Sequence, residues 1–258
     1  MRYLPSRYWA SILTTALYVK YPDFDALKKL LVSYYYQNWI AGGVITRIKQ
    51  TSINIIKNVK SNKGIKTIQE LILNNIDSYN TFDQYLYNLW DSSSVYPSKW
   101  VRPVLALANY FMVDEEKPNF IAMDAETQVE HILPQKPKRG SQWNADFDKE
   151  KKEEWVNHIA NLTLLKRKKN AQALNGDFDE KIKIYGGKDT SKVISCYDIT
   201  KELYRDYKKW DEKSLQKRYD FLYGIITPIL HTEGQEDEFE DEFEDEFEDE
   251  FEEEIDLE

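Results

Sequence analysis

The spacing of apolar residues changes twice along this chain, and these changes restrict the class of fold that it can form. Up to about residue 120, apolar residues recur every three or four positions, as they do on one face of an α-helix. Between about residues 124 and 185 two short apolar runs replace this spacing, and helical spacing returns after Gly186-Gly187. The sequence therefore predicts a mainly α protein of the α+β class, with a small motif of two strands and one helix inserted among its helices.

The helical stripes are expected to pack as the core. Three of them are Leu27, Leu30, Leu31, Tyr34 and Tyr35; Ile68, Leu71, Ile72 and Ile76; and Trp100, Val104, Leu107, Ala108 and Phe111. An alternative role for Tyr34–Tyr36 and Trp39 is stacking on nucleic-acid bases, but aromatic residues at helical spacing are more typical of packing.

The inserted motif begins with the alternating run Thr127–Ile132, which predicts a strand that ends before Pro134. A polar loop rich in Lys, Gly and Pro is expected next. The apolar run Leu162–Leu165 predicts a second strand, and Lys166–Ala171 predicts the start of a helix. We expect helical residues 1–120, the motif at 121–187, further helices at 188–232 that pack on the body, and an acidic tail at 233–258 that is disordered in isolation.

Charge is distributed unevenly along the chain. Of its 45 Asp and Glu residues, 18 lie in residues 233–258, so the 35 Lys and Arg residues of the preceding part meet 27 acids and give it a net charge of +8. The whole chain carries a net charge of −10. A basic body joined to an acidic tail is typical of proteins that bind nucleic acid.

The single cysteine, Cys196, excludes an intramolecular disulfide and a zinc site built from several thiolates. Residues 8–19 resemble a signal peptide in part, but no small-residue cleavage site follows them, and their spacing favours an amphipathic helix. No run reaches the ~18 apolar residues of a membrane span. We therefore expect a cytoplasmic protein without a membrane partner.

One of the three histidines has a recognisable chemical setting. His131 follows Glu130 at the end of the first predicted strand, in the sequence Glu130-His131-Ile132-Leu133-Pro134. Asn161 begins the run Asn-Leu-Thr-Leu-Leu, and Asn170 follows in the predicted helix. Each of these residues alone is more often structural, and His158 and His231 are interpreted in that way. Their conjunction points to chemistry, as a hypothesis that rests on a motif.

This succession resembles the HNH nuclease superfamily, which has a ββα-metal site. It is most similar to the HNH domain in the C-terminal half of GmrSD-type, modification-dependent (type IV) restriction enzymes. The similarity includes the Phe-x-x-Lys segment at 178–181 and extends over most of residues 1–230. Ala160 replaces the glycine that usually precedes Asn-Leu. If this position needs a positive φ, alanine would strain the turn by about 1 kcal/mol or more.

The resemblance implies a role for each residue of the motif. His131 would act as general base, Asn161 would orient the loop that carries this histidine, and Glu130 and Asn170 would bind one divalent metal ion. A neutral imidazole suits a general base near pH 7, and oxygen ligands favour Mg²⁺ or Mn²⁺. Five basic residues are candidate phosphate contacts, with a solvated helix face as the alternative for each: Lys166, Arg167, Lys168, Lys169 and Lys181.

The predicted function is a metal-dependent HNH DNA endonuclease, the cleavage part of a restriction or phage-defence system that acts on DNA, including base-modified phage DNA. Longer relatives carry a nucleotide-using sensor domain, and neither an Asp-Gly-Gln-Gln-Arg signature nor a phosphate-binding glycine loop occurs here. A separate sensor subunit or domain is therefore an expected partner. The alternative is a catalytically weak or inactive HNH scaffold that binds DNA or a partner and is regulated by its acidic tail as a DNA mimic.

Overall fold

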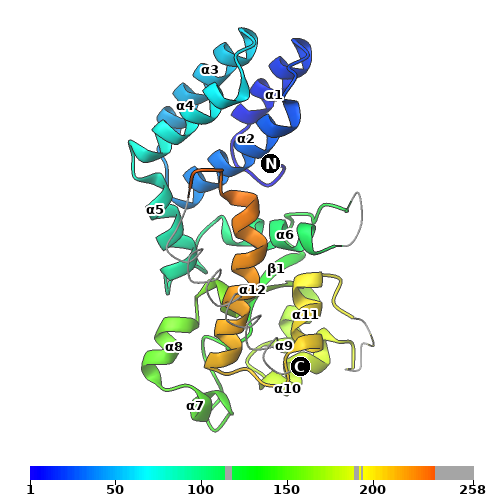
Figure 1. The fold of residues 1–258 in the computed structure, drawn as a ribbon. Coiled ribbons are helices and arrows are strands. Elements are labelled where there is room, and N and C mark those ends of the chain that lie inside the picture. Colours follow the sequence, from blue (N-terminus) through cyan, green and yellow to red (C-terminus); the bar gives the residue numbers. More distant parts are fainter. Residues whose placement is uncertain (114–117, 189–191, 193, 236–258) are drawn as a thin grey trace, which may run out of the picture.

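The structure is a computed structural model that describes residues 1–113, 118–188, 192 and 194–235. The chain begins with a run of helices (Figure 1): α1 (Tyr8–Tyr18), α2 (Phe24–Ile40), α3 (Ile45–Lys60), α4 (Ile65–Asp77), α5 (Thr81–Leu86), the π-helical turn η1 (Tyr87–Asp91) and α6 (Val101–Met112). The apolar stripes predicted on α2, α4 and α6 are largely buried, and Tyr34, Tyr35 and Tyr36 lie in the core. The prediction of packing rather than base stacking is confirmed for these three tyrosines.

The second part of the chain holds both strands. Its elements are β1 (Thr127–His131), α7 (Trp143–Asp146), α8 (Lys149–Trp155), the 3₁₀ turn η2 (Ile159–Asn161), β2 (Leu162–Lys166), α9 (Arg167–Ala173), α10 (Phe178–Tyr185), α11 (Asp198–Asp206) and α12 (Glu212–Leu230). The predicted order of strand, strand and helix is confirmed. The polar loop expected between the strands was wrong in part, because it contains α7 and α8. Their buried Trp143 and Trp155 anchor these short helices to the core.

The two strands pair in antiparallel register, with His131 opposite Leu162 and Thr127 opposite Lys166. Residues 162–165 of β2 are all buried, as expected of a strand covered on both faces. α9 begins directly after β2, so this helix is held against the two-stranded sheet. This register brings the end of β1, which carries His131, next to the turn that carries Asn161.

Helix α12 connects the two parts of the molecule (Figure 1). It packs against α2 and α6 at one side and against η2 beside the sheet. Arg218 on this helix is fully buried, where its guanidinium pairs with Glu202 of α11 and donates a 3.0 Å hydrogen bond to the Ile199 carbonyl. Within the described ranges, no helix combines the length and apolar character needed to cross a bilayer.

We predict that the Arg218→Met substitution lowers the free energy of unfolding by about 3 kcal/mol or more, because it leaves the buried Glu202 carboxylate without its ion pair. Urea unfolding measures this loss. The double variant Arg218→Met/Glu202→Gln should recover part of the stability, since it removes the unpaired charge. A loss below about 1 kcal/mol in the single variant would contradict a buried ion pair at this position.

Candidate active site

The imidazole of His131 lies at the end of β1, between that strand and a segment that precedes α6. Its ring centroid is 4.1 Å from that of Tyr96, at an interplanar angle of 52°. His131 is 9% exposed. The ring is therefore held against an aromatic neighbour while one part of it still reaches the surface.

Asn157 fixes the orientation of this ring. Its Oδ1 atom lies 3.1 Å from His131 Nε2 and accepts a 2.9 Å hydrogen bond from Gln135 Nε2. The Asn157 carbonyl accepts hydrogen bonds from the Val95 and Tyr96 amides, which ties Asn157 to the segment that carries the Tyr96 ring. With Asn157 Oδ1 as acceptor, His131 Nε2 carries the ring hydrogen. Nδ1 is then the nitrogen that accepts a proton.

Burial lowers the pKa of His131 to about 4, and the nearby Lys181 ammonium acts in the same direction, while the hydrogen bond to Asn157 opposes them. The ordinary pKa of histidine is 6.5. The imidazole is therefore neutral near pH 7, which is the protonation state that a general base needs.

Asn161 holds the backbone that follows His131. Its Oδ1 accepts hydrogen bonds from the Leu133 amide at 2.7 Å and from Trp210 Nε1 at 3.2 Å. Its Nδ2 donates to the carbonyls of Leu133 and Val156, both at 2.9 Å. The side chain is fully buried, and three of these hydrogen bonds are buried with it, while the one to Val156 is partly buried.

The Asn161→Ala substitution should lower the free energy of unfolding by about 2–4 kcal/mol, because it leaves several buried backbone and indole groups without partners. Chemical unfolding gives the change. The matched control is Asn74→Ala at an exposed position of α4, which should change stability by less than about 0.5 kcal/mol. Equal effects in the two variants would argue against Asn161 as the anchor of this loop.

Glu130 lies in a buried ion pair. Its Oε1 atom accepts hydrogen bonds from Lys181 Nζ at 2.7 Å and from Tyr185 Oη at 3.2 Å. Lys181 also donates to the His131 carbonyl and thereby joins α10 to the end of β1. Burial raises the pKa of Glu130, and the Lys181 ammonium opposes this rise.

This ion pair corrects one prediction made from the sequence. Lys181 is fully buried, so it cannot serve as a phosphate contact on the surface. The same correction applies to Lys169, which is 6% exposed and donates to the Ile184 carbonyl. Lys166 at the end of β2 and Arg167 and Lys168 at the start of α9 are exposed, as surface phosphate contacts must be.

A pocket of about 320 Å³ brings several predicted residues together. Glu130 and His131 of β1, Arg167 and Asn170 of α9, and Gln128 line it. Asn170 Nδ2 donates a 2.8 Å hydrogen bond to Gln128 Oε1, so the side-chain oxygen Oδ1 is the atom of this amide that could bind a cation. Asn161 is not among the lining residues, because its side chain lies in the interior behind the loop.

The oxygen donors of this pocket fit a divalent ion such as Mg²⁺ or Mn²⁺. Glu130 Oε1 accepts hydrogen bonds from Lys181 and Tyr185, and Glu130 and Asn170 line the same pocket. Across the described part of the chain, no cluster of three or more His, Cys, Asp or Glu residues could hold a metal ion. A hard ion with few protein ligands takes its remaining ligands from water and phosphate, as Mg²⁺ commonly does.

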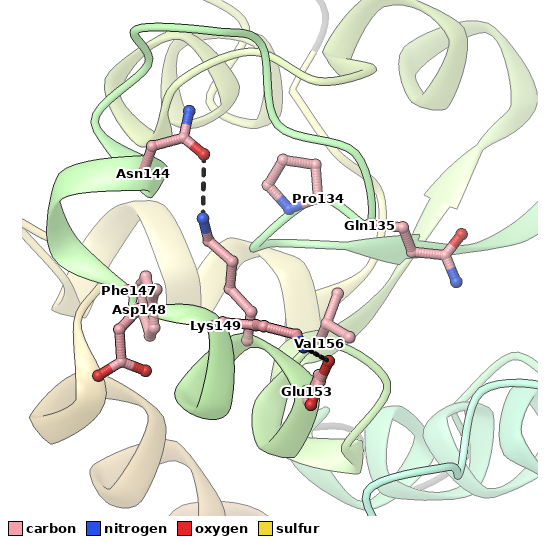
Figure 2. A pocket seen from close by; sticks show the side chains of 9 residues that line it. Pro134, Gln135, Asn144, Phe147, Asp148, Lys149, Glu153 and Val156 are labelled. Atoms are coloured by element: carbon pink, nitrogen blue, oxygen red, sulfur yellow. Dashed lines mark hydrogen bonds and ion pairs between the residues drawn. The ribbon is translucent and has the colours of Figure 1, made fainter.

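A neighbouring pocket of about 450 Å³ shares Pro134 and Gln135 with the first one (Figure 2). Its lysines already have partners. Lys152 donates a 3.0 Å hydrogen bond to Asn144, and Lys149 lies 3.7 Å from Glu153. The mixed charge and the absence of any predicted site residue from its lining set this pocket apart from the candidate active site.

The residues of the site that were not predicted from the sequence include Tyr96, Gln128, Gln135 and Asn157. Tyr96 lies far from the motif along the chain and belongs to a segment without helical or strand spacing. Asn157 lies four residues before Asn161. Its closeness to the Asn-Leu run is the one feature of the sequence that points to this residue. The expected strain at Ala160 does not occur, because Ala160 has a negative φ within η2.

His158 has the structural role expected from the sequence. Its Nδ1 accepts a 3.2 Å hydrogen bond from the Ala160 amide, and its Nε2 lies 2.6 Å from the Trp90 carbonyl. This pattern requires a neutral ring with hydrogen on Nε2. Burial lowers the pKa of His158, while the hydrogen bond to Trp90 opposes that shift.

Stability should therefore depend on pH through His158. Below the unfolded pKa of 6.5 the unfolded chain binds a proton that the folded chain does not, so the free energy of unfolding falls as the pH decreases. The stability difference between the wild type and His158→Gln should shrink by up to about 1.4 kcal/mol per pH unit below that value. Unfolding measured at pH 7.5 and pH 5.5 checks this, and a difference that stays constant or grows would contradict it.

The order of strand, strand and helix, with a histidine at the end of the first strand and an asparagine on the helix, is that of a small ββα motif. A family model described as GmrSD restriction endonucleases, C-terminal domain, matches residues 57–225. Because the match covers more than half of the chain, the protein belongs to this family. No curated protein and no solved structure gave a significant match.

Proposed function

We propose that this protein is a metal-dependent HNH endonuclease that hydrolyses phosphodiester bonds in DNA. The observation that carries the proposal is the convergence of a neutral His131 with Glu130 and Asn170 on one pocket. Membership of a restriction-endonuclease family supports DNA as the substrate. The residues of this pocket are those that hydrolysis needs, namely a base for water and oxygen ligands for a cation.

In the proposed reaction, His131 Nδ1 accepts a proton from the water that attacks the phosphorus atom. The bond from phosphorus to the leaving sugar oxygen breaks, and that oxygen takes up a proton from solvent. The hydrogen bond from Nε2 to Asn157 holds the ring in the required tautomer, and the contact with Tyr96 restricts its rotation. Asn161 fixes the backbone at Leu133 and so positions the strand end that carries the base. These contacts place the base before DNA binds, which lowers the entropic cost of reaching the transition state.

Glu130 and Asn170 would hold the divalent ion. When bound, the ion stabilises negative charge that develops on the phosphate and the leaving oxygen. Burial raises the pKa of Glu130, and the Lys181 ammonium opposes this rise and so favours the ionised carboxylate that a metal ligand needs. Restriction-endonuclease domains generally use divalent metal ions, and the chemistry of these oxygens favours Mg²⁺ or Mn²⁺.

The exposed start of α9 supplies the proposed DNA contacts. Arg167 lines the pocket, and Lys166 and Lys168 are the neighbours of Arg167 in the sequence. Positive charge beside the pocket would attract the phosphate backbone and place a phosphate near His131. We further propose that the protein acts in defence against modified DNA and works with a sensor subunit or domain.

The ion pair between Glu130 and Lys181 also favours a second candidate function, a non-catalytic scaffold that binds DNA. In that case Lys181 would replace the metal ion as the partner of Glu130. Binding of Mn²⁺ by the wild type, and its loss in Asn170→Ala, would favour the nuclease. Tight DNA binding without any metal binding would favour the scaffold.

We expect the His131→Ala substitution to lower the rate of plasmid nicking at least ~10²-fold, because it removes the general base. The assay compares Mg²⁺ or Mn²⁺ with EDTA, and EDTA should abolish cleavage by the wild type. Asn74→Ala is the matched control and should cleave like the wild type. Mn²⁺ affinity should survive in His131→Ala, which separates loss of the base from loss of the metal.

The pH dependence of the same assay gives an independent check. With the pKa of His131 near 4, the wild-type rate should not fall between pH 7.5 and pH 6, because the base stays unprotonated over that range. Nicking by His131→Ala at close to the wild-type rate, or cleavage that persists in EDTA, would rule out the proposed mechanism.

A further inference from the structure

A third, larger cavity lies away from the candidate active site and is lined by residues of α2, α6 and the C-terminal end of α12. Helix α12 packs against both α2 and α6 (Figure 1). This groove has a volume of about 760 Å³. Its floor is apolar and includes Leu30 and Val32 of α2, Leu107 of α6 and Ile229 of α12. The proposed nuclease reaction makes no use of it.

Aromatic rings at the edge of the groove are left exposed to water. Phe111 is 55% exposed and Phe120 is 46% exposed. The Phe120 ring stacks on Tyr110 at a centroid distance of 5.0 Å, so the aromatic surface is continuous. A contiguous apolar surface of this kind is typical of a binding site.

The rim of the groove is basic. The side chains of Lys29 and Lys66 lie exposed along it, and the Arg2 guanidinium lies 5.1 Å from the centre of the Phe120 ring. Among the described residues that line the groove, Glu233 is the single acid. The groove therefore suits a ligand that combines apolar side chains with negative charge.

The chain itself leads from this groove into a segment with that chemistry. Thr232 and Glu233 line the groove, and the Glu233 carbonyl accepts a 3.0 Å hydrogen bond from Gln69. Gln235 is tied to Gln37 of α2 by a 2.8 Å hydrogen bond. Residues 236–258 follow and lie outside the described residues.

That sequence contains 17 Asp and Glu residues, no Lys or Arg, and four phenylalanines at intervals of four: Phe239, Phe243, Phe247 and Phe251. Phe239 is four residues beyond Gln235, a span of up to about 13 Å in an extended chain. The first phenylalanines are therefore within reach of the groove.

We propose that residues 236–251 dock in this groove of their own chain. Phenylalanine side chains would cover the apolar floor, and the acidic residues between them would pair with Lys29, Lys66 and Arg2. Because the segment is tethered at the edge of the groove, its effective concentration there is high and a weak contact is sufficient. By its charge alone, the acidic segment could equally bind the basic start of α9. The apolar floor of the groove is what favours the groove, because it can contact the phenylalanines.

Photocrosslinking in the full-length chain tests this proposal. Phe243 is replaced by p-benzoylphenylalanine, the dilute protein is irradiated, and crosslinked peptides are identified by mass spectrometry in the monomer fraction. Crosslinks to peptides from α2, α6 or the end of α12 would support docking in the groove. Crosslinks confined to α9, crosslinks found only between two chains, or no crosslinks would overturn it.

Two sets of variants make the result specific. Phe111→Ser should lower the groove crosslink yield about fivefold or more, since it removes a large apolar contact, whereas Tyr18→Ser at another exposed aromatic position should not change it. Replacing Phe239, Phe247 and Phe251 by Ser keeps every charge and should lower the yield by a similar factor. An unchanged yield in both the Phe111 and the tail variants would show that charge alone directs the tail and would overturn the proposal.

Discussion

The side chain of Asn161 joins the end of the first strand to the turn before the second, and the candidate site depends on this junction. The Leu133 amide and carbonyl both pair with this one amide group. The backbone amide of Ile132 donates to the Asn161 carbonyl, so both the side chain and the backbone of Asn161 hold the residues that follow His131. Trp210 extends the junction toward α12. The position of His131 therefore depends on the turn before β2 and on its contact with Trp210.

The ion pair between Glu130 and Lys181 holds the opposite side of the same strand. Lys181 bonds to both the Glu130 carboxylate and the His131 carbonyl, so α10 contacts the strand exactly where the site residues lie. An unpaired carboxylate at this depth would be costly, and the ammonium offsets that cost. The same contact occupies one carboxylate oxygen and limits how Glu130 can bind a metal ion. Glu130 therefore has both a structural role, as the partner of Lys181, and a proposed role as a metal ligand.

Much of the fold was predictable because its elements are short and follow local rules. The alternation of Thr127–Ile132 and the apolar run at 162–165 each predicted a strand, and most residues of the predicted helical stripes are buried. The helices between the strands were missed, since α7 and α8 are short and polar and are held mainly by two buried tryptophans. Helix formation there depends on tertiary contacts that periodicity does not report.

For the candidate site, the sequence motif predicted which residues line the pocket. It did not predict which side chains are buried. Glu130, His131 and Asn170 do line one pocket, as their order on strand and helix implied. Lys181 was wrongly predicted to contact phosphate, because the sequence around it does not indicate that this lysine is buried and paired with a carboxylate. Tyr96 was missed because its contact with His131 is made by a segment far away in the sequence. Long-range contacts of this kind need the three-dimensional structure.

The most direct test of this account is a crystal structure of the protein soaked with Mn²⁺ and a short DNA duplex, with anomalous diffraction used to locate the metal ion. The account predicts an anomalous peak in the pocket lined by Glu130, His131 and Asn170, with a backbone phosphate beside it. A Mn²⁺ ion bound elsewhere, or a DNA complex that leaves this pocket without metal at saturating Mn²⁺, would contradict the central claim that these residues form the catalytic centre.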